Sequence, residues 1–193
     1  MSESIELPRR PKLIIVDGTD DFRLRVHGAT RPLRSFVASN VAWNYDPDEE
    51  TLRLCRGERY EDGWNQPEPS TAKTGKAVLW FGSGKGNGTA RVEAIRATGT
   101  NISVDMKQLA LGYVSIERDV VGEEPPYSSV RFEDCEVGKV NLDLTGGGLY
   151  ITNSTIRSAD SSVTMRGSCG VNVNVGSSLN FPINFELPKP PQA

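Results

Sequence analysis

The chain has 193 residues, enough for one hydrophobic core of ordinary size but short for two full domains. Its formal net charge of -3 and its sequence pI near 5.3 exclude the broad basic field that binding to nucleic-acid phosphates requires. The 19 glycines and 12 prolines indicate frequent turns and few long helices.

The first part of the chain, residues 1–75, contains short strand-like runs separated by turn residues such as Asp17 and Gly18. These runs read KLIIVDG, DFRLRVHG, RSFVASNVAWNY and TLRLCRG. The polar stretch ERYEDGWNQPEPSTAKTGK follows and has little to bury, which is typical of a linker or long loop. We therefore predict a small N-terminal β unit with its linker over residues 1–75, serving as an attachment unit or a cap.

The opening residues offer no address for export or for a membrane. Acidic residues precede basic ones, and the apolar run Leu13 to Val16 is too short for a signal-peptide core or a membrane span. The three cysteines, Cys55, Cys135 and Cys169, show no CxxC spacing and cannot all pair within one chain. We expect reduced thiols in a protein made inside a cell, with no membrane partner.

From Ala77 onward, apolar and polar residues alternate with a repeat. The segment VRFEDCEV aligns with LYITNSTI, so that the polar residues Asp134 and Asn153 coincide, and NLDLTG aligns with SVTMRG. Extending the alignment places first strands near residues 92, 114, 130, 149 and 171, and second strands near 102, 120, 142, 163 and 179. A repeat of about twenty residues is typical of solenoids.

This pattern predicts an all-β protein in which residues 76–186 form a short parallel β-helix of about five rungs. Inward residues would stack into aliphatic columns, and Asp134 and Asn153 would lie at corners, because short polar side chains tolerate tight turns. The proline-rich residues 187–193 form a tail. An antiparallel β-sandwich, whose strands also alternate, is the alternative fold.

The segments VRFEDCEV and LYITNSTI resemble rungs of the right-handed, pectin-lyase-like β-helix superfamily, over roughly Ala90 to Phe185. Resemblance to the enzymes of this superfamily implies one of two sites. One is a calcium-carboxylate cluster with a basic arginine, and the other is a set of aspartates that cleaves a glycosidic bond. Asp105, Asp143 and Arg166 are the residues that this resemblance offers on one face. The Asn-Thr-Asp, Asp-Asp and Gly-His-Gly motifs of polygalacturonases are absent from the repeats. We therefore expect no catalytic residue, no metal and no cofactor.

Two other motifs carry no chemistry. The glycine run FGSGKGNGTA lacks the Ser or Thr that a phosphate loop needs after its lysine, because Gly86 follows Lys85. The single histidine, His27, lies in a strand-like run of the N-terminal unit, where a half-buried side chain is the ordinary interpretation.

The repeat predicts one exposed polar ladder. If the strands near residues 114, 130 and 149 stack, their outward side chains present acids, an arginine and an aromatic ring on a flat sheet. We expect four of these side chains to bind a surface polysaccharide: Glu117, Arg131, Glu133 and Tyr150.

A short coil with a distinct N-terminal unit and no catalytic cluster also resembles a virion accessory protein of a tailed phage. This resemblance implies a non-enzymatic structural protein located in the virion, such as a capsid decoration protein, head fibre or spike. Its N-terminal unit would attach to a capsid or tail protein, and the β-helix would project as a homotrimer. A carbohydrate-binding or carbohydrate-cleaving β-helix and an intracellular protein-interaction module remain open as alternatives.

Overall fold

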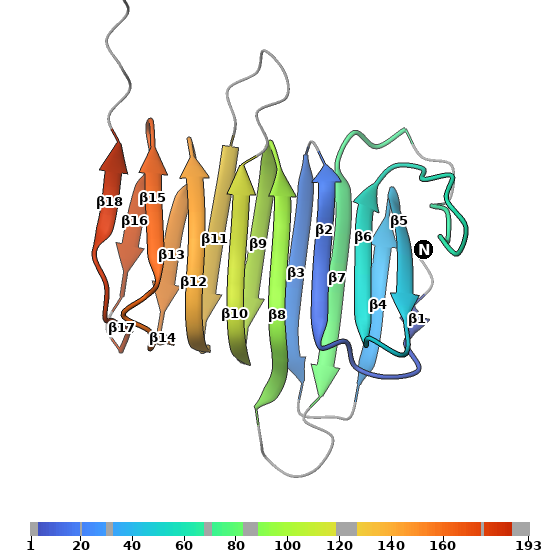
Figure 1. Cartoon of the computed structure of the whole chain (residues 1–193), viewed down its shortest axis with the longest axis horizontal. Coiled ribbons are helices and arrows are strands. Elements are labelled where there is room, and N and C mark those ends of the chain that lie inside the picture. Colours follow the sequence, from blue (N-terminus) through green and yellow to red (C-terminus); the bar gives the residue numbers. More distant parts are fainter. Residues whose placement is uncertain are drawn as a thin grey trace, which may run out of the picture.

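The structure is a computed structural model that describes residues 4–19, 21–29, 33–67, 71–82, 89–118, 127–174 and 176–186. These residues form strands and turns, and the described part of the chain contains no helix. The strands build two sheets that lie face to face, one of eight strands (sheet A) and one of ten (sheet B) (Figure 1). The predicted all-β class is therefore confirmed.

Sheet A is parallel through most of its width. Its strands, in spatial order, are β1 (Ile5–Glu6), β4 (Arg34–Ser39), β7 (Gly75–Gly82), β3 (Phe22–Ala29), β9 (Asn101–Lys107), β11 (Tyr127–Glu133), β13 (Gly148–Thr152) and β16 (Gly170–Val173). Neighbours from β7 to β16 pair in parallel. The pairs β1–β4 and β4–β7 are antiparallel.

Sheet B is parallel except at one edge. Its main path is β17 (Ser178–Leu179), β14 (Thr155–Ile156), β12 (Glu136–Thr145), β10 (Leu109–Arg118), β8 (Ala90–Gly99), β2 (Leu13–Thr19), β6 (Thr51–Arg56) and β5 (Val41–Asp46). Two further strands extend it, β15 (Ser162–Arg166) beside β12 and β18 (Ile183–Glu186) beside β15. The edge pair β5–β6 is antiparallel.

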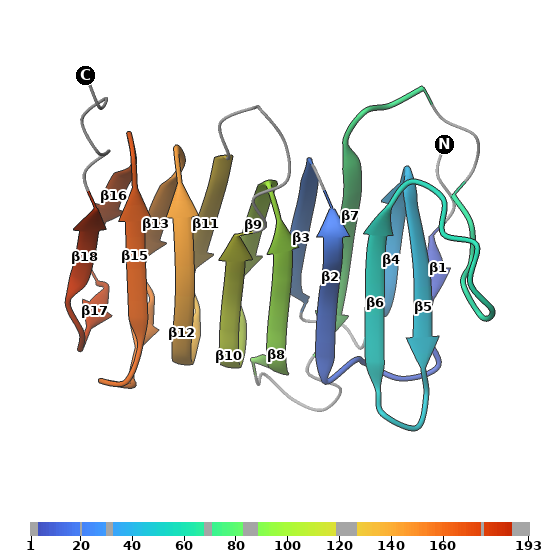
Figure 2. The same cartoon turned by 45° about the horizontal axis from the view of Figure 1, so that its top comes forward.

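From Ala90 onward, the chain crosses from one sheet to the other after almost every strand (Figure 2). Each strand pairs in parallel with an earlier strand of its own sheet. Ser129 pairs with Gly148, and Gly148 pairs with Gly170, so neighbouring strands of sheet A are offset by 19 (148 − 129) and 22 (170 − 148) residues. The described strand pairs of this region are parallel, which contradicts the antiparallel sandwich.

Polar residues with left-handed backbone mark the crossings from sheet A to sheet B. Gln108, Asp134 and Asn153 each follow a sheet A strand and have φ values of 55°, 54° and 46°. Asn153 Nδ2 donates a hydrogen bond of 2.7 Å to Asp134 Oδ1 at the neighbouring crossing. Asparagine and aspartate tolerate this conformation because their side chains bond locally. The predicted corner positions Asp134 and Asn153 are confirmed.

The core consists of side chains that alternate inward from both sheets. Val104, Val130 and Leu149 are paired across β9, β11 and β13 and are fully buried. One hydrophobic cluster extends from Leu7 to Met165. It includes side chains of β2 and β3, because these strands pair directly with β8 and β9.

The strand assignment needs one correction. The strands near residues 92 and 114 lie in the same sheet as the one near 142, sheet B, and the strand near 102 lies in sheet A beside the one near 130. Tyr127 pairs with Asn101 at an offset of 26 residues (127 − 101). This offset is larger than the repeat of about twenty residues, so an alignment with that fixed period pairs the wrong strands in this region. The strand expected near residue 120 and the tail at 187–193 lie outside the described residues.

Candidate binding face

The outer face of sheet A carries a row of side chains that crosses five strands. Successive members pair in register from β3 to β16, so they lie side by side at the spacing of parallel strands, about 4.8 Å. The members of this central row are Arg25, Asp105, Arg131, Tyr150 and Asn172. The row is continuous because β3, β9, β11, β13 and β16 pair in register here.

Arg131 and Tyr150 form the middle of the central row. The guanidinium carbon of Arg131 lies 5.2 Å from the centroid of the Tyr150 ring, a cation–π distance. The ring covers Gly148, where an added methyl group would lie 2.8 Å from the ring. Gly148 therefore provides the space in which the ring lies close to the sheet.

Two ion pairs lie near this aromatic contact. Arg25 Nε lies 3.5 Å from Asp105 Oδ2, in the central row itself. Lys107 Nζ lies 2.6 Å from Glu133 Oε1 in the neighbouring row, and this carboxylate raises the pKa of Lys107. Both pairs are substantially exposed, so each contributes little to stability and stays available to a ligand.

His27 stands beside Lys107 in the same row. Burial lowers its pKa most, and the nearby Arg25 and Lys107 lower it further, while Asp105 and Glu133 act in the opposite direction. At neutral pH the imidazole is therefore uncharged and can both donate and accept a hydrogen bond.

The row on the other side of the central row consists of small residues. Ser129 Oγ donates to Ser103 Oγ over 3.0 Å, and the next two positions are Gly148 and Gly170. Because these residues are small, they leave room for the Tyr150 ring over Gly148. The face thus combines one aromatic surface with hydroxyl, amide, carboxylate and cationic groups.

Three of the four predicted ligand residues lie together. Arg131 and Glu133 are on β11 and Tyr150 is on β13, all in sheet A. Glu117 is exposed on β10, which belongs to sheet B, so its place in the ladder was wrong. The error arises because the repeat of about twenty residues does not hold around residues 114–120, so the strand at 114 is grouped with the wrong sheet.

Sequence reasoning missed Arg25 and Lys107 as members of this face. The run DFRLRVHG does alternate basic and apolar residues, but its position in the chain predicts that it belongs to the N-terminal unit. Its partner across the sheet, β9, could be identified only through the parallel register.

The residues offered by the enzyme resemblance do not form one site. Arg166 Nε lies 2.9 Å from Asp143 Oδ1 on sheet B, whereas Asp105 lies on sheet A. Arg166 also pairs with Glu186. Among the described residues, no group of three histidine, cysteine, aspartate or glutamate side chains is placed to hold a metal ion.

No protein-family model matches the chain, and no curated protein matches it. A solved structure with some similarity is that of a proposed cell adhesion protein from Clostridium sporogenes. It is 9% identical, covers 97% of this chain and 100% of that chain, and has a TM-score of 0.34. A similarity this low carries no argument about fold or function.

The described residues contain no helix long and apolar enough to cross a membrane.

Proposed function

We propose that the two sheets are the faces of one short parallel β-helix of about five rungs from Ala90 onward. Support comes from the alternation of the chain between sheets and from the parallel pairing within each sheet. Stacked corners, such as the Asn153–Asp134 bond, favour the same architecture. This coil extends sheet A into a long, flat outer face.

We further propose that the protein is a non-enzymatic polysaccharide-binding protein that uses this face. The observation that carries the proposal is the half-buried Tyr150 ring, which lies over Gly148 and makes a cation–π contact with the Arg131 guanidinium. The apolar surface of an aromatic ring packs against the C–H groups of a sugar, and the neighbouring polar groups bond its hydroxyls. A continuous row across five strands suits a chain of sugars.

If the protein is located in a virion, the ligand of this face would be the polysaccharide of a host surface. Attachment to a capsid or tail protein and assembly as a homotrimer belong to the same hypothesis, which stays a prediction. The solution mass of the purified chain, compared with 21.1 kDa for one copy, tests the trimer.

The polysaccharide proposal is tested with a panel of surface polysaccharides and three variants. We expect Arg131→Ala and Tyr150→Ala each to weaken binding by about ten-fold or more, because each removes part of the aromatic contact. Glu117→Ala is the matched control, since this residue is exposed on the opposite sheet. It should bind as the parent protein does.

Two results would overturn the proposal. One is an absence of binding across the panel, and the other is equal affinity of the parent protein and the Arg131→Ala/Tyr150→Ala double variant. Capture of a specific host protein without any polysaccharide binding would instead favour the interaction module.

A further inference from the structure

The outer face of sheet A carries more positive than negative charge. Five outward side chains on the strands from β7 to β16 are cationic: Arg23, Arg25, Lys76, Lys107 and Arg131. Two are acidic, Asp105 and Glu133, and His27 is uncharged at neutral pH because burial lowers its pKa. This face therefore has a charge of +3 (5 − 2), whereas the whole chain has a net charge of -3.

Two of the five cations have no partner among the described residues. Each of the two carboxylates pairs with one cation, as described above, and the Arg131 guanidinium contacts an aromatic ring. The side chains of Arg23 and Lys76 form no hydrogen bond or ion pair with any residue that the structure describes. Asp21, the acid nearest to Arg23 in the sequence, accepts a hydrogen bond of 2.8 Å from Thr74 Oγ1.

The pairing register brings these two cations together. Arg23 on β3 lies directly opposite Lys76 on β7, and both side chains are exposed. Neighbouring strands are about 4.8 Å apart, so the two side chains leave the same face of the sheet side by side. Like charges in such positions repel each other. An anion bound between them would offset this repulsion.

A hydroxyl group lies on the other side of Arg23. Ser103 on β9 is its register partner there, and Ser103 Oγ accepts a hydrogen bond of 3.0 Å from Ser129 Oγ. A serine hydroxyl that accepts one bond can still donate its own proton. The row thus offers an anion a guanidinium, an ammonium and a hydroxyl donor on three adjacent strands.

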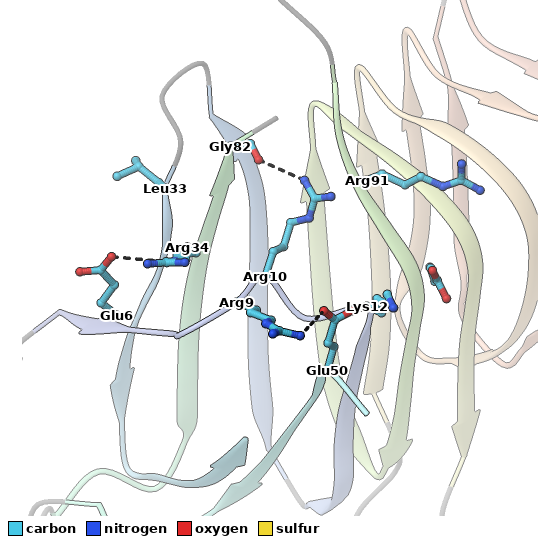
Figure 3. A pocket seen from close by; sticks show the side chains of 10 residues that line it. Glu6, Arg9, Arg10, Lys12, Leu33, Arg34, Glu50, Gly82 and Arg91 are labelled. Atoms are coloured by element: carbon cyan, nitrogen blue, oxygen red, sulfur yellow. Dashed lines mark hydrogen bonds and ion pairs between the residues drawn. The ribbon is translucent and has the colours of Figure 1, made fainter. Parts of the chain in front are cut away.

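A second group of cations lies in a cavity of about 700 Å³ beside the segment before β2 (Figure 3). There, carboxylates of the protein lie against the cations: Glu50 is 2.6 Å from Lys12 and 3.7 Å from Arg9, and Glu6 is 3.4 Å from Arg34. The cationic pair of sheet A has no such partner within the described part of the chain. Its charge is therefore available to a ligand.

We propose that the polysaccharide bound by sheet A is acidic and that one of its carboxylate or sulfate groups lies between Arg23 and Lys76. Guanidinium and ammonium groups bind such oxyanions through charge-assisted hydrogen bonds. Arg23 is two residues from Arg25 of the central row, about 6.6 Å along β3, so one sugar chain can reach both. This inference rests on the proposed polysaccharide-binding function.

The test compares the binding of alginate with that of carboxyl-reduced alginate of equal length, at low ionic strength. We expect the parent protein to bind alginate about ten-fold or more tightly than the neutral form. Arg23→Gln and Lys76→Gln should each weaken alginate binding by about ten-fold and leave binding of the neutral form unchanged. Both residues are exposed, so both variants should fold normally.

Arg96→Gln is the matched control. It removes the same charge from an exposed arginine of β8, in sheet B, that also has no ion pair with a described residue. Its affinity for alginate should equal that of the parent protein.

Dextran sulfate and dextran repeat the comparison for sulfate esters. A larger preference for the charged polymer in this pair would identify a sulfated ligand, and a larger preference in the alginate pair would identify a uronic acid. Either result supports the inference if the preference depends on Arg23 and Lys76.

Three results would overturn the inference: equal affinity for the charged and neutral forms in both pairs, an equal loss in Arg96→Gln and Arg23→Gln, or no binding of any of the four polymers. None of them by itself decides the polysaccharide proposal, which the wider panel with Arg131→Ala and Tyr150→Ala tests separately.

Discussion

Asn153 shows how one residue can set a corner of the fold. Its backbone is left-handed, with φ of 46°, and its side chain donates to Asp134. Replacing it by alanine removes the hydrogen bond and places a Cβ-bearing residue without local compensation in this conformation, which costs roughly 1–2 kcal/mol. Glycine loses the same bond but tolerates the conformation.

We therefore predict that Asn153→Ala lowers the free energy of unfolding by about 1–2 kcal/mol and that Asn153→Gly lowers it by less. Urea denaturation of the three proteins measures both values. A glycine variant that is less stable than the alanine variant would contradict the backbone argument.

His27 makes stability depend on pH in a defined direction. Its folded pKa lies below the ordinary value of 6.5, because of burial and then the charges of Arg25 and Lys107. As pH falls through about 6.5, the unfolded chain gains a proton that the folded chain does not. This contribution to stability is thus complete above that pH and is lost as pH falls toward the folded pKa.

We expect the free energy of unfolding to fall between about pH 7.5 and pH 5.5, and to fall less in His27→Gln. Denaturation curves at several pH values in this window provide the measurement. Identical pH dependence of the two proteins would show that His27 does not carry the effect.

At this scale the sequence predicted part of the site. Alternation alone placed Arg131, Glu133 and Tyr150 outward, because side chains of a strand point to opposite faces in turn. It could not show that Tyr150 covers Gly148 or contacts Arg131, since both contacts depend on rotamers and on the pairing of β11 with β13.

Sheet B contains a column of close backbone contacts between neighbouring strands. A methyl group added at Gly112 would lie 2.5 Å from the carbonyl oxygen of Glu93, and one added at Gly138 would lie 2.5 Å from that of Gly112. The pairing of β10 with β12 passes over both glycines, from Leu111–Val137 to Tyr113–Lys139. The strands therefore approach closely at this point only because both residues lack a side chain.

Gly138→Ala should destabilise the protein by roughly 1–3 kcal/mol, because the backbone of β10 or β12 must shift. Gly170→Ala is the control, since an added methyl group there has nothing within 4 Å, and its effect should stay within about 0.5 kcal/mol. Thermal or urea unfolding of the pair tests this. Equal effects would mean that the close contact is not a constraint.

The position of whole strands was predictable only where the repeat is regular. The segments around residues 130 and 149 differ by 19 (149 − 130), close to the repeat, and they do lie side by side. The offset of 26 between Asn101 and Tyr127 hides the same relation from an alignment with a fixed period. Glu117 was assigned to the wrong face for this reason.

The whole molecule is a stack whose ends differ from its middle. Central side chains such as Val130 and Phe132 are fully buried, whereas Val173 and Phe185 near the last strands are 44% and 62% exposed. In a stack, each strand is stabilised by its neighbours, so terminal strands have fewer stabilising contacts. Figure 1 shows β16 and β18 at the end of the array opposite β5.

Hydrogen exchange should report this gradient. We predict slow exchange for the amides of β9, β10, β11 and β12, and faster exchange for those of β16 and β18. Mass spectrometry of labelled peptides gives the rates. Uniform protection along the stack would indicate that the terminal strands are covered, as they would be in an oligomer.

The relation of the first 75 residues to the rest was the hardest feature to predict. Their strands were expected to form an attachment unit or cap, yet β2 and β3 pair in parallel with β8 and β9 within one hydrophobic cluster. The partners β2 and β8 are 81 residues apart (95 − 14), since Ile14 pairs with Ile95. Local alternation carries no signal of such distant pairing.

The most direct test of the central claim, that sheet A binds polysaccharide, is a nuclear magnetic resonance titration with fragments of the best panel ligand. Isotope-labelled protein would report which backbone amides shift. We predict saturable shifts concentrated in β9, β11 and β13 around Arg131 and Tyr150, and none on sheet B at Glu117. Shifts confined to sheet B, or no saturable shift at all, would contradict it.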